Sequence, residues 1–201
     1  MLIDFGQRTV QSKMVFYGCA MSGKSTALRS LYGQLNGHSP LVSIETSHDK
    51  NRRTLFYDFG ALELKFGIWK LKLNFWTATG QDFYCATRST VLQGTDGVFF
   101  VADSQDSFVE DNIKSWHELR SFFGSRLEQI VPVIICLNKR DLPNLVSTDF
   151  MRENLQLLSN TLIYETIATK DENIYPAFRK LLETIFQIHK AAKTSIMNQL
   201  K

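Results

Sequence analysis

The chain has 201 residues, of which 44% are hydrophobic and 21% are charged, and its formal net charge is +3. This length suits a single domain spanning residues 1–201 with a substantial core, and the ordinary composition excludes a disordered or fibrous chain. The mild charge and dispersed lysines give no reason to expect a nucleic-acid partner. We expect no integral membrane segment, because no apolar run reaches the roughly 18 residues that a membrane span needs. Three cysteines without metal-ligand spacing fit a reducing, cytoplasmic location.

The first functional pattern along the chain is a glycine-rich loop at residues 18–25. It reads Gly-Cys-Ala-Met-Ser-Gly-Lys-Ser, which matches the G-x-x-x-x-G-K-S pattern of phosphate-binding loops. A strand-like run precedes it and helical apolar spacing follows it, so backbone N–H groups and a helix N-terminus would face the phosphates. Lys24 is placed to reach the β- and γ-phosphates, and the Ser25 hydroxyl is placed to bind Mg²⁺. The predicted phosphate-binding residues are Gly18, Cys19, Ala20, Met21, Ser22, Gly23, Lys24, Ser25 and Thr26.

Beyond this loop, strand-like runs alternate with helical patterns. A polar stretch at 37–53 reads as a loop, with a short strand at 41–44 left open. Apolar residues alternate on both sides of Gly67, which predicts a hairpin. Further strands are expected at 98–101, 130–137 and 162–164, and helices at 109–123, at 147–159 with Ser147 or Thr148 as cap, and from 174 onward. This alternation predicts an α/β fold in which helices cover both faces of a mostly parallel sheet.

A second motif directly follows the strand that ends at Leu137. Residues 138–141 read Asn-Lys-Arg-Asp, which resembles the N-K-x-D motif with which GTPases read guanine. The Asp141 carboxylate can accept hydrogen bonds from guanine N1–H and its 2-amino group, and adenine lacks that pair of donors. The stem of Lys139 can cover the purine face, and Asn138 can tie this loop to the phosphate loop.

A third segment, Glu165 to Thr169, follows the next strand. GTPases carry a segment here whose alanine N–H contacts guanine O6, and Ala168 aligns with that alanine, followed by Thr169. The serine expected before the alanine is replaced by Ile167, so the match is partial. We therefore predict that Ala168 and Thr169 belong to the base site, with a plain strand end as the alternative.

The chain resembles the MglA-type small GTPases of the Ras-like superfamily over about residues 1–190. The resemblance is carried by the segment 76–81, which reads Trp-Thr-Ala-Thr-Gly-Gln where relatives have T-x-P-G-Q, and by the segments 53–59, 94–104 and 138–144. It implies a P-loop NTPase with a Ras-like, mixed but mostly parallel six-stranded sheet. We add an N-terminal strand near residues 1–5 and a helical extension at 190–201.

The resemblance also implies roles for residues outside the phosphate loop. Thr54 would bind Mg²⁺ and sense the γ-phosphate, with Thr46 as a substitute. Gly80 would donate its N–H to the γ-phosphate, and Gln81 would orient the attacking water. Arg53, beside the switch threonine, matches the position of an arginine finger supplied in cis. The alternatives are a solvated basic turn at Arg53 and a surface glutamine at Gln81.

These residues indicate a GTP-hydrolysing molecular switch that uses Mg²⁺, is slow without a regulator and controls an effector. A roadblock-type GTPase-activating partner is implied by resemblance only. Thr77 stands where GTPases usually have aspartate, Thr79 replaces a proline, and Ala20 adds a methyl group near the finger's entry. These departures motivate an alternative, a scaffold that holds GTP or GDP with negligible hydrolysis. A third alternative, an ATP-dependent enzyme, is disfavoured by the 138–141 motif.

Overall fold

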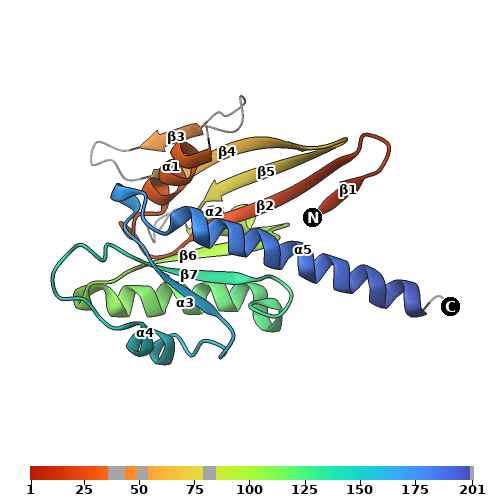
Figure 1. The fold of residues 1–201 in the computed structure, drawn as a ribbon. Helices are drawn as coiled ribbons and strands as arrows, with labels where there is room; N and C mark the ends of the chain where they lie inside the picture. Colours follow the sequence, from red (N-terminus) through yellow and green to blue (C-terminus); the bar gives the residue numbers. More distant parts are fainter. Residues whose placement is uncertain (36–43, 49–53, 79–84, 200–201) are drawn as a thin grey trace.

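A computed structural model describes residues 1–35, 44–48, 54–78 and 85–199 of the chain. Among these residues it contains one eight-stranded sheet with helices on both faces (Figure 1). The strands are β1 (Leu2–Asp4), β2 (Thr9–Tyr17), β3 (Ile44–His48), β4 (Thr54–Phe66), β5 (Trp69–Thr77), β6 (Gly97–Asp103), β7 (Val133–Asn138) and β8 (Leu162–Glu165). The helices are α1 (Lys24–Leu35), α2 (Cys85–Leu92), α3 (Val109–Phe123), α4 (Thr148–Asn154) and α5 (Ile174–Gln199). The described residues also form the short 3₁₀ turns η2 (Asp106–Phe108), η3 (Gly124–Arg126) and η4 (Ala168–Lys170).

The strand order along the sheet is β3-β4-β5-β2-β6-β7-β8. The five strands from β5 to β8 pair in parallel, while β3, β4 and β5 pair antiparallel. The short strand β1 pairs antiparallel with β2, away from this path. The predicted mixed, mostly parallel sheet and the N-terminal strand are therefore confirmed.

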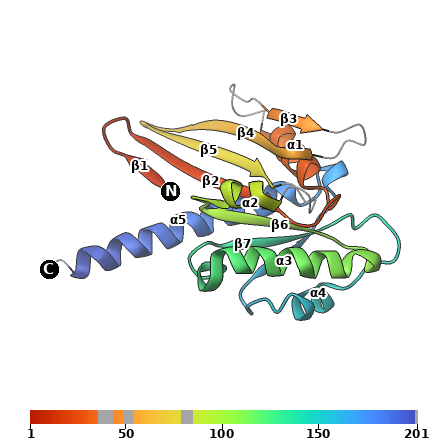
Figure 2. The same cartoon turned by 180° about the vertical axis from the view of Figure 1, so that it is seen from behind.

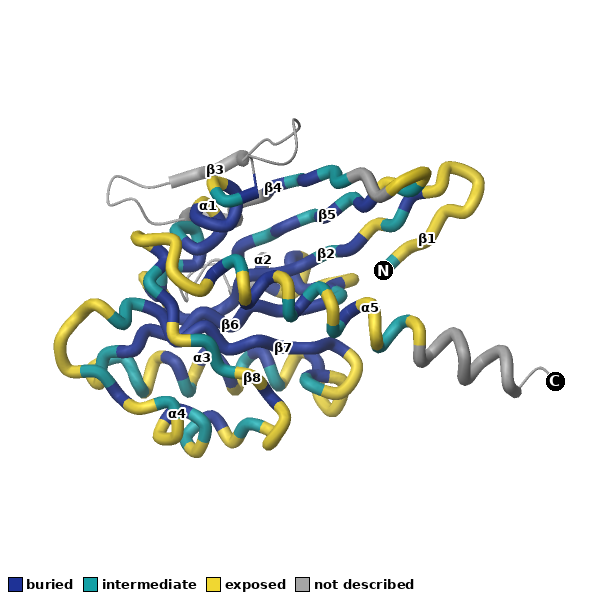
Figure 3. The backbone as a smooth tube through the Cα atoms, in the orientation of Figure 1, coloured by how far each residue is buried: buried dark blue, intermediate teal, exposed yellow. Residues whose placement is uncertain are grey.

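The central strands are buried because their side chains are apolar on both faces. Every residue of β6 and β7 is buried, as is the second half of β2 (Figure 3). This pattern is typical of parallel strands that helices cover on both sides. By contrast, buried side chains alternate with more exposed ones along β5, because the face that carries Leu71, Leu73 and Phe75 packs into an apolar core.

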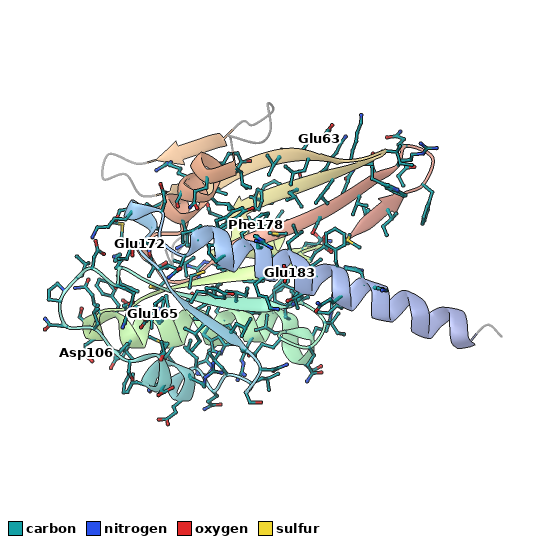
Figure 4. The ribbon with its side chains drawn as sticks, viewed as in Figure 1. Glu63, Asp106, Glu165, Glu172, Phe178 and Glu183 are labelled. Atoms are coloured by element: carbon teal, nitrogen blue, oxygen red, sulfur yellow. The ribbon has the colours of Figure 1, made fainter. Side chains whose placement is uncertain are left out.

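The helices divide between the two faces of the sheet. Leu28 and Leu31 of α1 share one apolar core with Phe178 and Leu181 of α5, and the Phe178 ring lies 5.9 Å from that of Phe75 on β5 (Figure 4). The opposite core gathers residues of α2, α3 and α4, centred on the fully buried Trp116, on the side seen in Figure 2. The sheet is thus held between two helical layers, and its strand ends stay open to carry loops.

Two predicted boundaries need correction. The six-stranded core gains β3, since residues 44–48 pair with β4, whereas the sequence pattern predicts a loop over 37–53 and leaves a short strand at 41–44 open. Residues 37–43 and 49–53 of that stretch lie outside the described residues. The helix predicted for 147–159 ends at Asn154, because Gln156 adopts a positive φ of 50° that a helix cannot continue. Its predicted cap is confirmed, since the Ser147 side chain accepts a hydrogen bond from the Phe150 N–H at 3.1 Å.

An apolar pocket of about 550 Å³ lies between α5 and the first residues of β5. Its walls include Val10, Trp69, Leu71, Leu182 and Phe186. None of its lining residues belongs to the predicted nucleotide site, whose loops follow the carboxyl ends of the strands instead.

Candidate nucleotide-binding site

Three loops converge at the carboxyl ends of the parallel strands. The phosphate loop follows β2, and the 138–141 motif begins at the last residue of β7. The 165–169 segment begins at the last residue of β8 and runs into η4. They gather at the left-hand end of the sheet in Figure 1. Ligands of open α/β sheets bind beyond this edge, so the topology brings the predicted phosphate and base motifs to one place.

The phosphate loop depends on two glycines for its shape. Gly18 has φ +145° and Gly23 has φ +101°, values that side chains disfavour. An added Cβ would overlap the Val101 carbonyl oxygen at the first position and the Asn138 amide at the second. Met21, exposed at the loop tip, also has a positive φ of 62°, and such strained residues concentrate at ligand-binding loops. The backbone therefore forms the close-fitting turn that a phosphate-binding loop requires.

Lys24, Ser25 and Thr26 form the first turn of α1, whose N-terminus carries the positive end of the helix dipole. The Lys24 side chain is buried, and its Nζ donates to the carbonyls of Gly18 at 3.0 Å and Cys19 at 2.6 Å. These bonds hold the Lys24 side chain folded back over the phosphate loop. The ammonium is thereby held at the concave side of the turn, where anionic oxygens would be bound.

Cys19 and Ala20 occupy the loop between the two glycines. The Cys19 thiol is buried, donates to Asn112 Oδ1 at 3.3 Å, and has its pKa raised mainly by burial. A raised pKa disfavours the reactive thiolate. The contact of the thiol with Asn112 instead packs the loop against α3. Ala20 is exposed.

Asn138 joins all three loops through one buried amide. Its Nδ2 donates to Ser22 O at 2.8 Å, which confirms the expected tie between the base motif and the phosphate loop. Its Oδ1 accepts from the Thr166 hydroxyl at 3.2 Å and from the Ala168 N–H at 3.0 Å. In the structure the Ala168 N–H, which was expected to contact guanine O6, thus faces Asn138. Thr169 lies beside it, exposed, in η4.

Lys139 and Asp141 of the same motif differ in their surroundings. Lys139 has φ +65° and pairs with the buried carboxylate of Asp103 at 2.6 Å. Asp141 lies in the following turn and pairs only loosely with Lys170, at 3.6 Å. Because such a surface pair contributes little, the Asp141 carboxylate stays available to accept hydrogen bonds from a base.

Several predicted residues lie outside what the structure describes. Arg53, Gly80 and Gln81 are not among the residues that the structure describes. Thr54 begins β4 and Thr46 lies in β3, but only their backbones are described. Their assigned roles therefore remain predictions.

The described residues offer oxygen ligands suited to Mg²⁺ only sparsely. Among them, no group of three or more His, Cys, Asp or Glu side chains could hold a metal. Mg²⁺ in nucleotide sites takes few protein oxygens and fills its shell with phosphates and water, so a single hydroxyl such as that of Ser25 fits this chemistry. Thr77, which replaces the usual aspartate, is buried at the end of β5.

Comparison with known proteins agrees with this geometry. The ADP-ribosylation factor family model matches residues 1–185. The mutual gliding-motility protein MglA of Myxococcus xanthus is 34% identical, over 91% of this chain and 94% of its own length. The GTP-binding protein ypt3 of Schizosaccharomyces pombe is 31% identical over 76% of this chain and 72% of its own, and human Rab-4B is 25% identical over 86% and 75%.

The chain is an Arf/Ras-like small GTPase. The resemblance to MglA-type proteins inferred from the motifs is confirmed. This small GTPase is a GTP-binding switch and a GTP hydrolase, and the scaffold without turnover is not favoured. In the described part of the small GTPase, no helix is both long and apolar enough to cross a bilayer.

Sequence reasoning missed three residues that build the site of this GTPase. Asp103 and Asn112 are fully buried beside the phosphate and base loops, and Arg140 links its loop to Glu165 at 2.6 Å (Figure 4). A signal for Asp103 was present, because it ends an apolar strand as Asn138 does and is level with it in the β6–β7 register. Asn112 carried no such signal, since its role depends on how α3 packs.

Proposed function

We propose that this GTPase binds GTP and GDP through the described loops and hydrolyses GTP with Mg²⁺. One observation carries the proposal. The 2.8 Å bond from Asn138 to Ser22 joins the guanine motif to the phosphate loop, so a nucleotide spanning both is recognised as one unit. An ATP-dependent enzyme would have no use for the Asp141 carboxylate beside that joint.

Each residue type has a defined task in this proposal. The backbone of Gly18 to Thr26 cradles the phosphates, Lys24 moves its ammonium toward the β- and γ-phosphates, and Asp141 accepts hydrogen bonds from guanine. Bound Mg²⁺ would neutralise the charge that develops on the β- and γ-oxygens. Ser25 and Thr54 would hold the ion, while Thr77 offers a neutral hydroxyl in place of the usual carboxylate.

For the chemical step we assign positioning to Gln81 and charge stabilisation to Arg53. Gln81 would orient the attacking water and Gly80 would donate its N–H to the γ-phosphate. Arg53 would stabilise transition-state charge from within the same chain, a task that a regulator performs for GTPases without such an arginine. We expect intrinsic hydrolysis to be slow, since Thr77 lowers the negative charge available near the ion.

The GTP state would order the switch segments, and hydrolysis would release them from an effector. We further propose a cytoplasmic protein with one GTPase domain over residues 1–201, residues 190–201 being its helical extension. The 34% sequence identity to MglA supports the proposal of a roadblock-type GTPase-activating partner. We propose no nucleic-acid ligand.

Two measurements test this function. Competition of unlabelled GDP and ADP against fluorescent GDP should show strong preference for GDP, and equal displacement by ADP would refute guanine recognition. Single-turnover hydrolysis should be slow in the wild type and slower still in Gln81→Leu and Arg53→Ala. If all three proteins hydrolysed GTP at the uncatalysed rate, the chain would bind the nucleotide without catalysis.

A further inference from the structure

Asp103 places a fully buried carboxylate at the end of β6, directly beside the base motif. Its Oδ2 pairs with Lys139 Nζ at 2.6 Å, and its Oδ1 accepts from the Gln105 N–H at 3.1 Å. A buried charge without its partner costs several kcal/mol, so the two side chains are strongly held together. The pair therefore determines where the Lys139 ammonium lies.

The Lys139 ammonium is restrained from a second side as well. Nζ lies 5.4 Å from the centre of the Phe108 ring, a cation–π distance. With its end held by Asp103 and Phe108 and its backbone fixed at φ +65°, the lysine has little freedom along its length. Its side chain is 26% exposed, which leaves part of it open to contact.

Asp103 is itself anchored toward the phosphate loop by Asn112 of α3. Asn112 Oδ1 accepts from the Asp103 N–H at 3.0 Å, and its Nδ2 donates to the Asp103 carbonyl at 2.8 Å. The same Oδ1 accepts from the Cys19 thiol at 3.3 Å. One chain of contacts thus runs from the phosphate loop through α3 and β6 to Lys139.

We propose that Asp103 is a positioning residue for base recognition, an inference that rests on the nucleotide site proposed above. By holding the Lys139 ammonium, it presents the apolar stem of that lysine to the face of the purine. The carboxylate does not touch the nucleotide. Its effect on binding passes through Lys139.

Simple electrostatics predicts that loss of the Asp103 charge changes nucleotide affinity in the opposite direction, which makes the proposal testable. Removing a negative charge near a polyanionic ligand should tighten binding, whereas loss of positioning should weaken it. Asp103→Asn keeps the shape and an acceptor for Gln105 but removes the charge. Asp106→Asn is the matched control, because Asp106 lies nearby on the exposed η2 turn (Figure 4).

The measurement is the dissociation constant of fluorescent GDP for the full chain, with thermal unfolding recorded for each variant. Asp103→Asn should weaken GDP binding by about tenfold, the scale of a lost charge-assisted bond, while Asp106→Asn leaves it unchanged. Asp103→Asn should weaken inosine diphosphate by the same factor, since both purines offer the same face. Unchanged or tighter GDP binding by Asp103→Asn would overturn the proposal.

A double-mutant cycle separates positioning from a merely structural role. In a Lys139→Met background, Asp103→Asn should cause no further loss of GDP affinity, because no ammonium remains to be held and only the removal of a negative charge is left to act. An equal tenfold loss in that background would refute positioning through Lys139. If Asp103→Asn alone does not fold, the double variant is compared directly with Lys139→Met, with the same two outcomes. A wild type that fails to prefer GDP over ADP would instead refute the nucleotide site itself.

Discussion

Replacing Asn138 by alanine tests whether one amide holds the three loops of the site together. The change leaves the Ser22 carbonyl, the Thr166 hydroxyl and the Ala168 N–H without the partner that each has in the structure. All three residues are buried, so water cannot easily replace the lost bonds. At about 1 kcal/mol for each bond, the free energy of unfolding should fall by about 3 kcal/mol.

For a chain of this size that loss corresponds to roughly 6–12 °C in melting temperature. The assay is thermal and urea unfolding followed by circular dichroism on nucleotide-free protein, because bound nucleotide would mask the difference. Thr166→Val removes one of the three bonds and should cost about a third as much, near 1 kcal/mol.

A matched control makes the result decisive. Asn154→Ala is the same chemical change at a half-buried position, where Nδ2 donates to the Phe150 carbonyl of its own helix. It should alter the free energy of unfolding by less than about 0.5 kcal/mol. If Asn138→Ala lost no more stability than Asn154→Ala, the amide would not be the joint between the loops.

Four other outcomes follow from the packing and burial of single residues. Gly18→Ala should lower the urea midpoint strongly, because its Cβ would overlap a β6 carbonyl, whereas Gly33→Ala, with open space on α1, should raise stability by about 0.5–1 kcal/mol. A lower midpoint for Gly33→Ala would contradict this reasoning. Ser147→Ala should cost about 1 kcal/mol through the lost α4 cap, measured by urea unfolding, and an unchanged midpoint would show that the cap bond contributes nothing. Burial raises the pKa of Cys136 to about 12 and also raises that of Cys19, so alkylation at pH 8 followed by mass spectrometry should be far slower than in urea. Equal rates for Cys19 in both states would show that its thiol is reactive in the folded chain and would contradict this reasoning.

Strand ends explain why so much of the site could be predicted. The glycine loop and the Asn138 motif each follow an apolar run. The carboxyl ends of parallel strands lie at the same end of a sheet, whatever the strand order, so the two motifs come together. The hairpin around Gly67 was equally local, since alternation and a turn residue define it. These elements depend on neighbours in sequence, which a single chain displays directly.

Other features depend on partners distant in sequence. The strand β3 forms because residues 44–48 reach the edge of β4, and its polar composition gave no apolar pattern to predict it. The helix α4 stops early because Gln156 takes a left-handed backbone conformation, although no glycine marks the position. The burial of Asp103 beside Lys139 likewise follows from packing between β6 and the base loop.

The hydrogen bonds of Asn138 also indicate which side chains of the site can be substituted. Two of its three partners are backbone atoms, the Ser22 carbonyl and the Ala168 N–H, which every amino acid except proline supplies in full. The third is a hydroxyl on Thr166. The joint therefore constrains the path of the chain around residue 167 more than the side chain there, so isoleucine can stand where relatives carry serine. Substitution of Ile167 should therefore leave the three loops in place, whereas substitution of Asn138 removes all three bonds at once.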